Sequence, residues 1–112
     1  MRTIIFPFPS EFEQELESRK WRDGGSEVIV LKSHPLNMNT RKPVDFDFKE
    51  FVKLLIGKAG REDTTRLVLC MPSDMERIGE ISGEMPCRLE IILKNGFNAD
   101  KVILHDGNGF VK

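Results

Sequence analysis

The sequence has few of the residues that build metal centres and disulfide frameworks. It contains two cysteines and two histidines in 112 residues, and neither a C-x-x-C pair nor an H-E-x-x-H motif occurs. Cys70 lies within the apolar run 67–71, where we predict a buried, reduced and inert thiol. A Cys70–Cys87 disulfide is the less favoured interpretation. We therefore predict no metal.

Long hydrophobic runs are also missing. No stretch approaches the ~20 apolar residues that a transmembrane helix needs. The short apolar run near the first residue is broken by Pro7 and Pro9, unlike a signal peptide, and no N-x-Ser/Thr sequon occurs. These features favour a reducing cytoplasm and no membrane partner.

Neither sign of charge is in excess. Seventeen basic and 18 acidic residues give a net charge of −1. Domains that bind duplex nucleic acid are usually far more basic, so duplex binding is disfavoured.

Motifs for nucleotide binding and nucleophilic catalysis are absent too. The chain has no G-x-G-x-x-G, no G-x-x-x-x-G-K-[ST] and no G-x-S-x-G. The glycine-containing stretch 57–61 follows a predicted helix, and the dipole at the end of a helix disfavours anions. We predict no cofactor.

What the chain does contain is a regular alternation of short apolar runs and helical patterns. The predicted strands are 2–6, 28–31, 66–71 and 100–104. Residues 66–71 are predicted to be the most central of these. Apolar strands alternating with helices favour a single α/β domain with a mainly parallel four-stranded sheet and right-handed crossovers.

The strongest predicted helix begins at the N-cap Asp47 and ends at Gly60. Its apolar residues recur at helical spacing and predict a face that packs on the sheet. They are Phe48, Phe51, Val52, Leu55, Ile56 and Ala59. A shorter helix is predicted to begin at the N-cap Ser73.

The first predicted helix runs from the N-cap Ser10 to about Arg22, and its apolar face is thin. Phe12 and Leu16 share one side, whereas Trp21 points elsewhere by the 100° rule. This helix is expected to lie on the surface. Trp21 then packs beside a loop, forms a dimer contact or anchors a partner, because Trp is enriched at interfaces.

Residues 88–96 allow two interpretations. The apolar positions fit a helix or an alternating strand, and Asn95-Gly96 is good C-cap chemistry, which favours the helix. A strand here would instead give a mixed α+β sheet. The turn 106–109 is expected to return residues 110–111 as a short C-terminal β-hairpin.

One candidate site follows from the predicted topology. Ligands bind at the carboxyl ends of strands in open parallel sheets. Four polar groups follow the predicted strands: Ser10, Ser33-His34, Ser73-Asp74 and His105-Asp106. His34 or His105 is the candidate general base, oriented by Asp74 or Asp106. The alternative is structural, because Ser10 and Ser73 already serve as N-caps and Asp106 opens a glycine-rich turn.

Residues 32–42 form a second candidate. This loop carries Lys32, His34, Arg41 and Lys42, a small cationic patch for phosphate, RNA or an acidic partner. A solvated loop is the alternative.

The absence of catalytic and cofactor signatures favours a small cytoplasmic interaction or regulatory protein without catalytic activity. Its partner is expected to be a protein, or a second copy in a homodimer, bound through Trp21, His34, Arg41 and Lys42. One alternative is a small α/β enzyme or ligand-binding domain that uses the strand-end groups. The other is a nucleic-acid-associated protein that uses the 32–42 loop.

Overall fold

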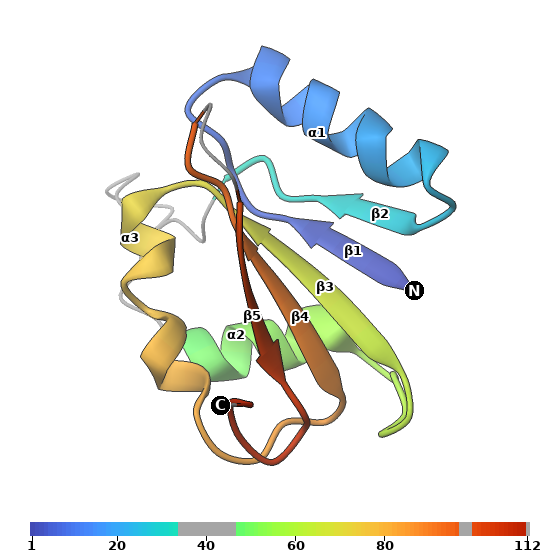
Figure 1. Cartoon of the computed structure of the whole chain (residues 1–112), viewed down its shortest axis with the longest axis vertical. Helices are drawn as coiled ribbons and strands as arrows, with labels where there is room; N and C mark the ends of the chain where they lie inside the picture. Colours follow the sequence, from blue (N-terminus) through green and yellow to red (C-terminus); the bar gives the residue numbers. More distant parts are fainter. Residues whose placement is uncertain (34–46, 97–99, 112) are drawn as a thin grey trace, which may run out of the picture.

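Five strands form one mixed sheet in the computed structural model, which describes residues 1–33, 47–96 and 100–111. The strands lie in the order β2-β1-β3-β4-β5 (Figure 1). Their bounds are β1 Arg2–Ile5, β2 Glu27–Val30, β3 Thr64–Leu69, β4 Arg88–Leu93 and β5 Lys101–His105. The first four pair in parallel, and β5 is antiparallel to β4. A mainly parallel sheet with a central β3 is confirmed, but the predicted number of four strands is wrong.

The fifth strand is β4, which was predicted to be a helix. Leu89 and Ile91 are buried on one side of the sheet, whereas Ile92 is buried on the other. Because β4 has neighbours on both edges, this segment is stabilised by pairing that no local pattern reveals. Gly96, predicted to end a helix, has φ +58° in a turn after the strand.

The extra strand reverses the direction of β5. His105 is opposite Leu89 and therefore lies at the amino ends of the parallel strands. The chain then turns, and His105 forms an antiparallel bridge with Phe110. The predicted C-terminal return is thus present as a single bridge.

One side of the sheet carries the main core. It is covered by α2 (Phe48–Ile56), α3 (Pro72–Met75) and the 3-10 helix η1 (Ile78–Ile81). The predicted stripe of α2 is confirmed, with Phe48, Val52 and Ile56 fully buried. Two predicted boundaries are wrong. The helix α2 ends at Gly57, which has φ +66°, and not at Gly60. Ser73 lies inside α3 and is not its N-cap, because Pro72 already occupies the first turn.

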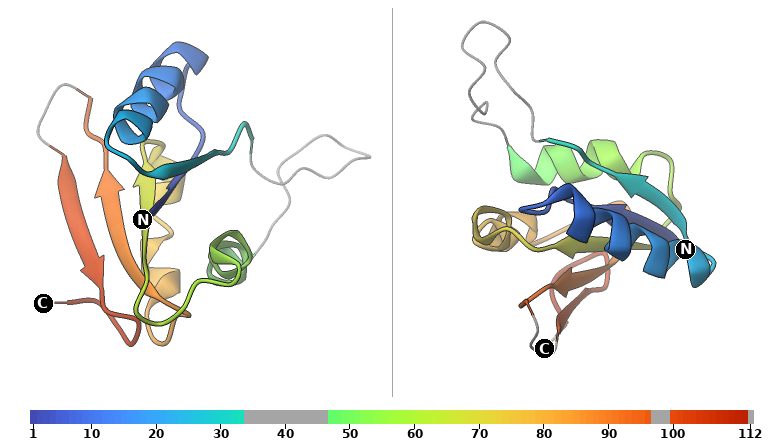
Figure 2. Two further views of the ribbon diagram at one scale, coloured as in Figure 1. Left: turned by 90° about the vertical axis from the view of Figure 1, so that its right-hand side faces the viewer. Right: turned by 90° about the horizontal axis from the view of Figure 1, so that it is seen from above.

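The helix α1 (Glu11–Asp23) lies on the opposite side of β1 and β2 from α2 (Figure 2). Its inward side is polar: Gln14, Glu17 and Ser18 are buried. Phe12 and Leu16 point outward and are 73% and 49% exposed. The apolar core on this side is correspondingly small, with Ile5, Val68 and Ile92 as its buried members.

The two cysteines are both free, but their predicted burial is wrong. Cys87 is buried and its thiol lies 3.5 Å from the Thr65 hydroxyl, whereas Cys70 is half-buried. Cys70 follows the last residue of β3, so it lies just beyond the carboxyl end of the central strand and not inside it.

Candidate binding cleft

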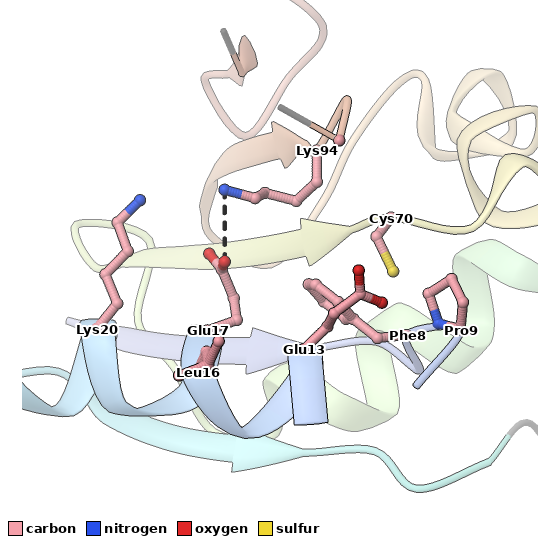
Figure 3. A pocket seen from close by; sticks show the side chains of 9 residues that line it. Phe8, Pro9, Glu13, Leu16, Glu17, Lys20, Cys70 and Lys94 are labelled. Atoms are coloured by element: carbon pink, nitrogen blue, oxygen red, sulfur yellow. Dashed lines mark ion pairs between the residues drawn. The ribbon is translucent and has the colours of Figure 1, made fainter. Parts of the chain in front are cut away.

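A cleft of about 400 Å³ opens at the carboxyl ends of β1, β3 and β4, beside α1. This is the edge at which open parallel sheets bind their ligands. The lining residues are Phe8, Pro9, Glu13, Leu16, Glu17, Lys20, Cys70, Lys94 and Gly96. Apolar side chains and charged side chains thus share one concavity (Figure 3).

Local sequence places α1 beside this edge. Pro7 and Pro9 follow β1, and Ser10 then caps the helix by accepting a hydrogen bond from the Glu13 backbone N–H at 3.2 Å. The Ser10 hydroxyl also donates to Glu13 Oε2 at 3.0 Å. Because both contacts fix the first turn, the Glu13 carboxylate is held at the mouth of the cleft.

Gln14 anchors the same turn to the sheet. Its side-chain Nε2 donates to the backbone carbonyl of Phe6 at 3.2 Å and to that of Leu31 at 2.8 Å. These carbonyls belong to the chain just after β1 and β2. A buried amide therefore fixes the rotation of α1 about its axis, which turns Leu16 toward the cleft and solvent.

A partly buried ion-pair chain forms one wall of the cleft. Lys94 Nζ lies 3.4 Å from Glu17 Oε2 (Figure 3). It also lies 2.8 Å from Asp100 Oδ2. Burial lowers the pKa of Lys94, but the hydrogen bond and charge of Asp100 and the charge of Glu17 outweigh it, so the pKa rises above its usual value. Lys94 is therefore a fixed cation and not a nucleophilic amine.

Cys70 lies on the floor of the cleft. Its thiol donates to the Pro7 backbone carbonyl at 3.3 Å. Burial, and then the negative charges of Asp74, Glu13 and Glu17, raise the pKa of Cys70 to about 12. The thiol stays protonated at neutral pH and is a poor nucleophile.

The outer side of α1 continues the apolar part of the cleft. Leu16 lines the cleft, and Phe12 lies one helical turn before it on the same side of the helix. Phe12 is the second most exposed large apolar side chain among the described residues, after Leu54 on α2. Two exposed apolar residues beside a partly apolar cleft mark a surface suited to binding.

The predicted catalytic set is not brought together. His105 lies at the amino ends of the parallel strands, away from the cleft, because β5 is antiparallel. Its buried imidazole accepts a hydrogen bond at Nδ1 from the Gly107 backbone N–H at 3.0 Å, and it packs edge-on against Phe110. The prediction that both histidines share one edge with Asp74 therefore fails for His105.

The two aspartates of that set have separate positions. Asp106 accepts hydrogen bonds from the backbone N–H groups of Asn108 and Gly109, which hold its pKa below the usual value. Asp106 thus stabilises the glycine-rich turn, which is the structural alternative to a role in catalysis. Asp74 is buried in α3, next to the cleft, and its charge acts on the Cys70 thiol.

The other predicted partner-binding residues have mixed outcomes. His34, Arg41 and Lys42 lie outside the described residues, so the 32–42 loop stays a prediction. Trp21 is half-buried against the small core of the α1 side. Its Nε1 donates to Glu17 Oε1 at 2.8 Å, and the Arg66 guanidinium lies 4.0 Å from the ring centroid.

Sequence reasoning missed Glu13, Leu16, Cys70 and Lys94 as site residues. Lys94 was assigned to a helix and Cys70 to a buried strand, so neither was placed at a strand end. The signal that would have found them is the same strand-end rule applied to the correct strands.

Within residues 1–33, 47–96 and 100–111, no three His, Cys, Asp or Glu side chains form a metal-binding group. No helix in that part of the chain has the length and hydrophobicity to span a bilayer. No protein-family model, curated protein or solved structure matches the chain.

Proposed function

We propose that this protein is a non-catalytic binding domain that recognises another protein through the outer side of α1 and the adjoining cleft. The observation that carries the proposal is the orientation of α1. A helix with buried Gln14, Glu17 and Ser18 and exposed Phe12 and Leu16 is turned against the usual pattern for a surface helix. Exposed apolar side chains of this kind are a recurrent feature of protein interfaces.

The hydrogen bonds of Gln14 indicate that specific contacts, and not chance packing, set the orientation of α1. They tie α1 to two separate backbone carbonyls, so exposure of Phe12 is an enforced property of the fold. In the alternative orientation the Gln14 amide would face solvent and the Phe6 and Leu31 carbonyls would lose this donor; a buried acceptor left without a partner costs about 1–3 kcal/mol.

The chemistry of the cleft favours recognition over catalysis. Lys94 and Cys70, the amine and the thiol nearest the sheet, are both held in their protonated forms. A small-molecule-binding domain is the second candidate, because the cleft lies where α/β sheets bind ligands.

The test is selection of peptide ligands from an unbiased phage-displayed library, with intact protein as bait. The variant Phe12→Ser/Leu16→Ser removes the exposed apolar pair. Leu54→Ser is the matched control, because Leu54 is equally apolar and 79% exposed on α2, the helix on the opposite side of the sheet. All three proteins should melt at closely similar temperatures, because exposed substitutions change stability by about 0.5 kcal/mol or less.

We expect peptides that bind the wild type and Leu54→Ser but not the double variant. The proposal is contradicted if the selected peptides bind all three proteins equally, or if the library yields no binding peptide. Sedimentation at increasing protein concentration adds a second arm. Self-association that the double variant abolishes would identify a second copy as the occupant and overturn recognition of another protein.

A further inference from the structure

We infer that the segment recognised by the cleft and the outer side of α1 is basic and apolar, with a Lys or Arg side chain that enters the cleft and apolar neighbours that cover Phe12 and Leu16. This inference rests on the proposed function and specifies the chemistry of its partner. It follows from the distribution of charge around the cleft.

The amino-terminal half of α1 is strongly acidic. Residues 11–17 contain four glutamates and no basic residue. The remaining three residues are Phe12, Gln14 and Leu16. Acidic side chains therefore flank both exposed apolar residues, and of these glutamates Glu15 is paired with Arg19 at 3.4 Å. Negative charge near the start of a helix is also favoured by the helix dipole.

The cations of the cleft do not neutralise this charge. Lys94 is shared by two carboxylates, Glu17 and Asp100. The Lys20 ammonium lies 4.9 Å from the Trp21 ring centroid. Glu13 is at the mouth of the cleft, where its carboxylate accepts a hydrogen bond from the Ser10 hydroxyl and its backbone N–H donates to the same hydroxyl. The lining itself carries two carboxylates, Glu13 and Glu17, and two ammonium groups, Lys20 and Lys94. Asp100 and Asp74 beside it add two more carboxylates, so acidic charge exceeds basic charge around the cleft.

The Cys70 thiol indicates the sign of the electrostatic potential at the floor of the cleft. Three carboxylates, those of Asp74, Glu13 and Glu17, disfavour its thiolate, in addition to the effect of burial. Burial disfavours a charge of either sign, but these three carboxylates favour a cation over an anion near the floor. A Lys or Arg side chain fits such a site, because its charged end is carried on an apolar stem that can lie along Leu16 and Phe8.

An acidic partner segment is excluded by the same reasoning. Its carboxylates would meet Glu13 and the other glutamates of α1, and like charges that face each other across an interface weaken binding. A purely apolar segment would bury the Glu13 carboxylate without a counter-charge, which is also unfavourable.

The test uses three synthetic peptides of equal length, labelled with fluorescein, and measures binding to the intact protein by anisotropy. The first places Lys beside Leu and Phe at helical spacing. The second replaces every Lys with Glu, and the third keeps Lys but replaces Leu and Phe with Ser. We expect the first peptide to bind at least about 10-fold more tightly than either of the others, since it alone satisfies both halves of the site.

Two variants then locate the charge effect. Glu13→Gln should weaken binding of the first peptide by about 2- to 5-fold, as for one partly exposed ion pair. Glu62→Gln is the matched control, because Glu62 is an exposed carboxylate at the amino ends of β3 and β4 and lines a different cleft. The Glu62→Gln variant should bind the first peptide with the same affinity as the wild type. Raising the salt from about 50 to about 300 mM should weaken binding of the first peptide, because partly exposed charges are screened.

The results separate this inference from the proposed function. If the Glu-containing peptide binds as well as the Lys-containing peptide, and Phe12→Ser/Leu16→Ser still abolishes both, the binding surface stands and the basic partner is wrong. If the Lys peptide without apolar residues binds equally well, binding is only electrostatic and the inference fails. If no peptide responds to substitution of Phe12 and Leu16, the proposed function itself fails.

Discussion

The Trp21 indole donates a hydrogen bond to Glu17 Oε1 at 2.8 Å, one turn back along the inward side of α1. The other carboxylate oxygen of Glu17 lies 3.4 Å from Lys94 Nζ. One glutamate therefore links the only tryptophan of the chain to the wall of the cleft. Trp21 thereby supports the wall of the cleft, and its contact with a partner stays a prediction.

Substitution should separate these two roles. Trp21→Ala removes ring packing, the bond to Glu17 and the Arg66 contact, and should lower the free energy of unfolding by about 2–4 kcal/mol. Phe12→Ala should change it by less than about 0.5 kcal/mol, because the side chain is exposed. Urea unfolding measures both. Equal effects of the two substitutions would mean that α1 is turned differently.

Much of the fold could be predicted from periodicity. The stripe of α2, the capping residues Ser10 and Asp47 and the central β3 all follow from local pattern, and all are present. Local pattern could not decide β4, because Leu89 and Ile92 fit either a helix face or two sides of a strand. Pairing with β3 and β5 decides it, and that pairing is a long-range contact.

The error in β4 also made the predicted catalytic site wrong. Assigning 88–96 to a helix made β5 parallel and placed His105 at the wrong end of the sheet. The orientation of α1 was hidden for a different reason. Gln14 faces inward because two backbone carbonyls need a donor, and no hydrophobicity pattern records such a need.

Lys94→Met should destabilise the protein by about 1–3 kcal/mol, because it leaves a buried carboxylate without its counter-charge. The Glu17 side chain is only 9% exposed, and that of Lys94 is 17% exposed. Lys53→Met is the control. Lys53 pairs with an exposed glutamate, Glu50, one turn earlier, and its loss should cost less than about 0.5 kcal/mol. Thermal unfolding of both variants is the measurement, and equal losses would remove the structural role of Lys94.

Two serines of the first helix should respond oppositely to alanine. Ser18 is fully buried, and its hydroxyl has no hydrogen-bond partner among the described residues. Ser18→Ala should leave stability unchanged or raise it by up to about 1 kcal/mol, since alanine has the higher helix propensity. Ser10→Ala should lower it by about 1 kcal/mol, because Ser10 caps the helix. A loss at Ser18 as large as that at Ser10 would show that its hydroxyl does have a partner.

The Cys70 thiol makes the stability of the protein depend on alkaline pH. Its pKa is about 12 in the folded chain, against a reference value of 9.0. Between these values the unfolded chain has released the proton and the folded chain has not, so raising the pH favours unfolding. The full contribution is present below pH 9.0 and is lost progressively toward pH 12. Cys70→Ala lacks this contribution, whereas all other titratable groups are common to both proteins.

The informative quantity is therefore the difference in unfolding free energy between the wild type and Cys70→Ala, measured in urea at a series of pH values. We expect a constant difference below pH 9.0 and a loss of wild-type stability relative to the variant above it. Glu13→Gln should make that loss smaller, because it removes one of the carboxylates that disfavour the thiolate. A difference that stays constant through the alkaline range would mean that the Cys70 thiolate is tolerated in the folded cleft. The acidic field that we assign to the floor would then be absent.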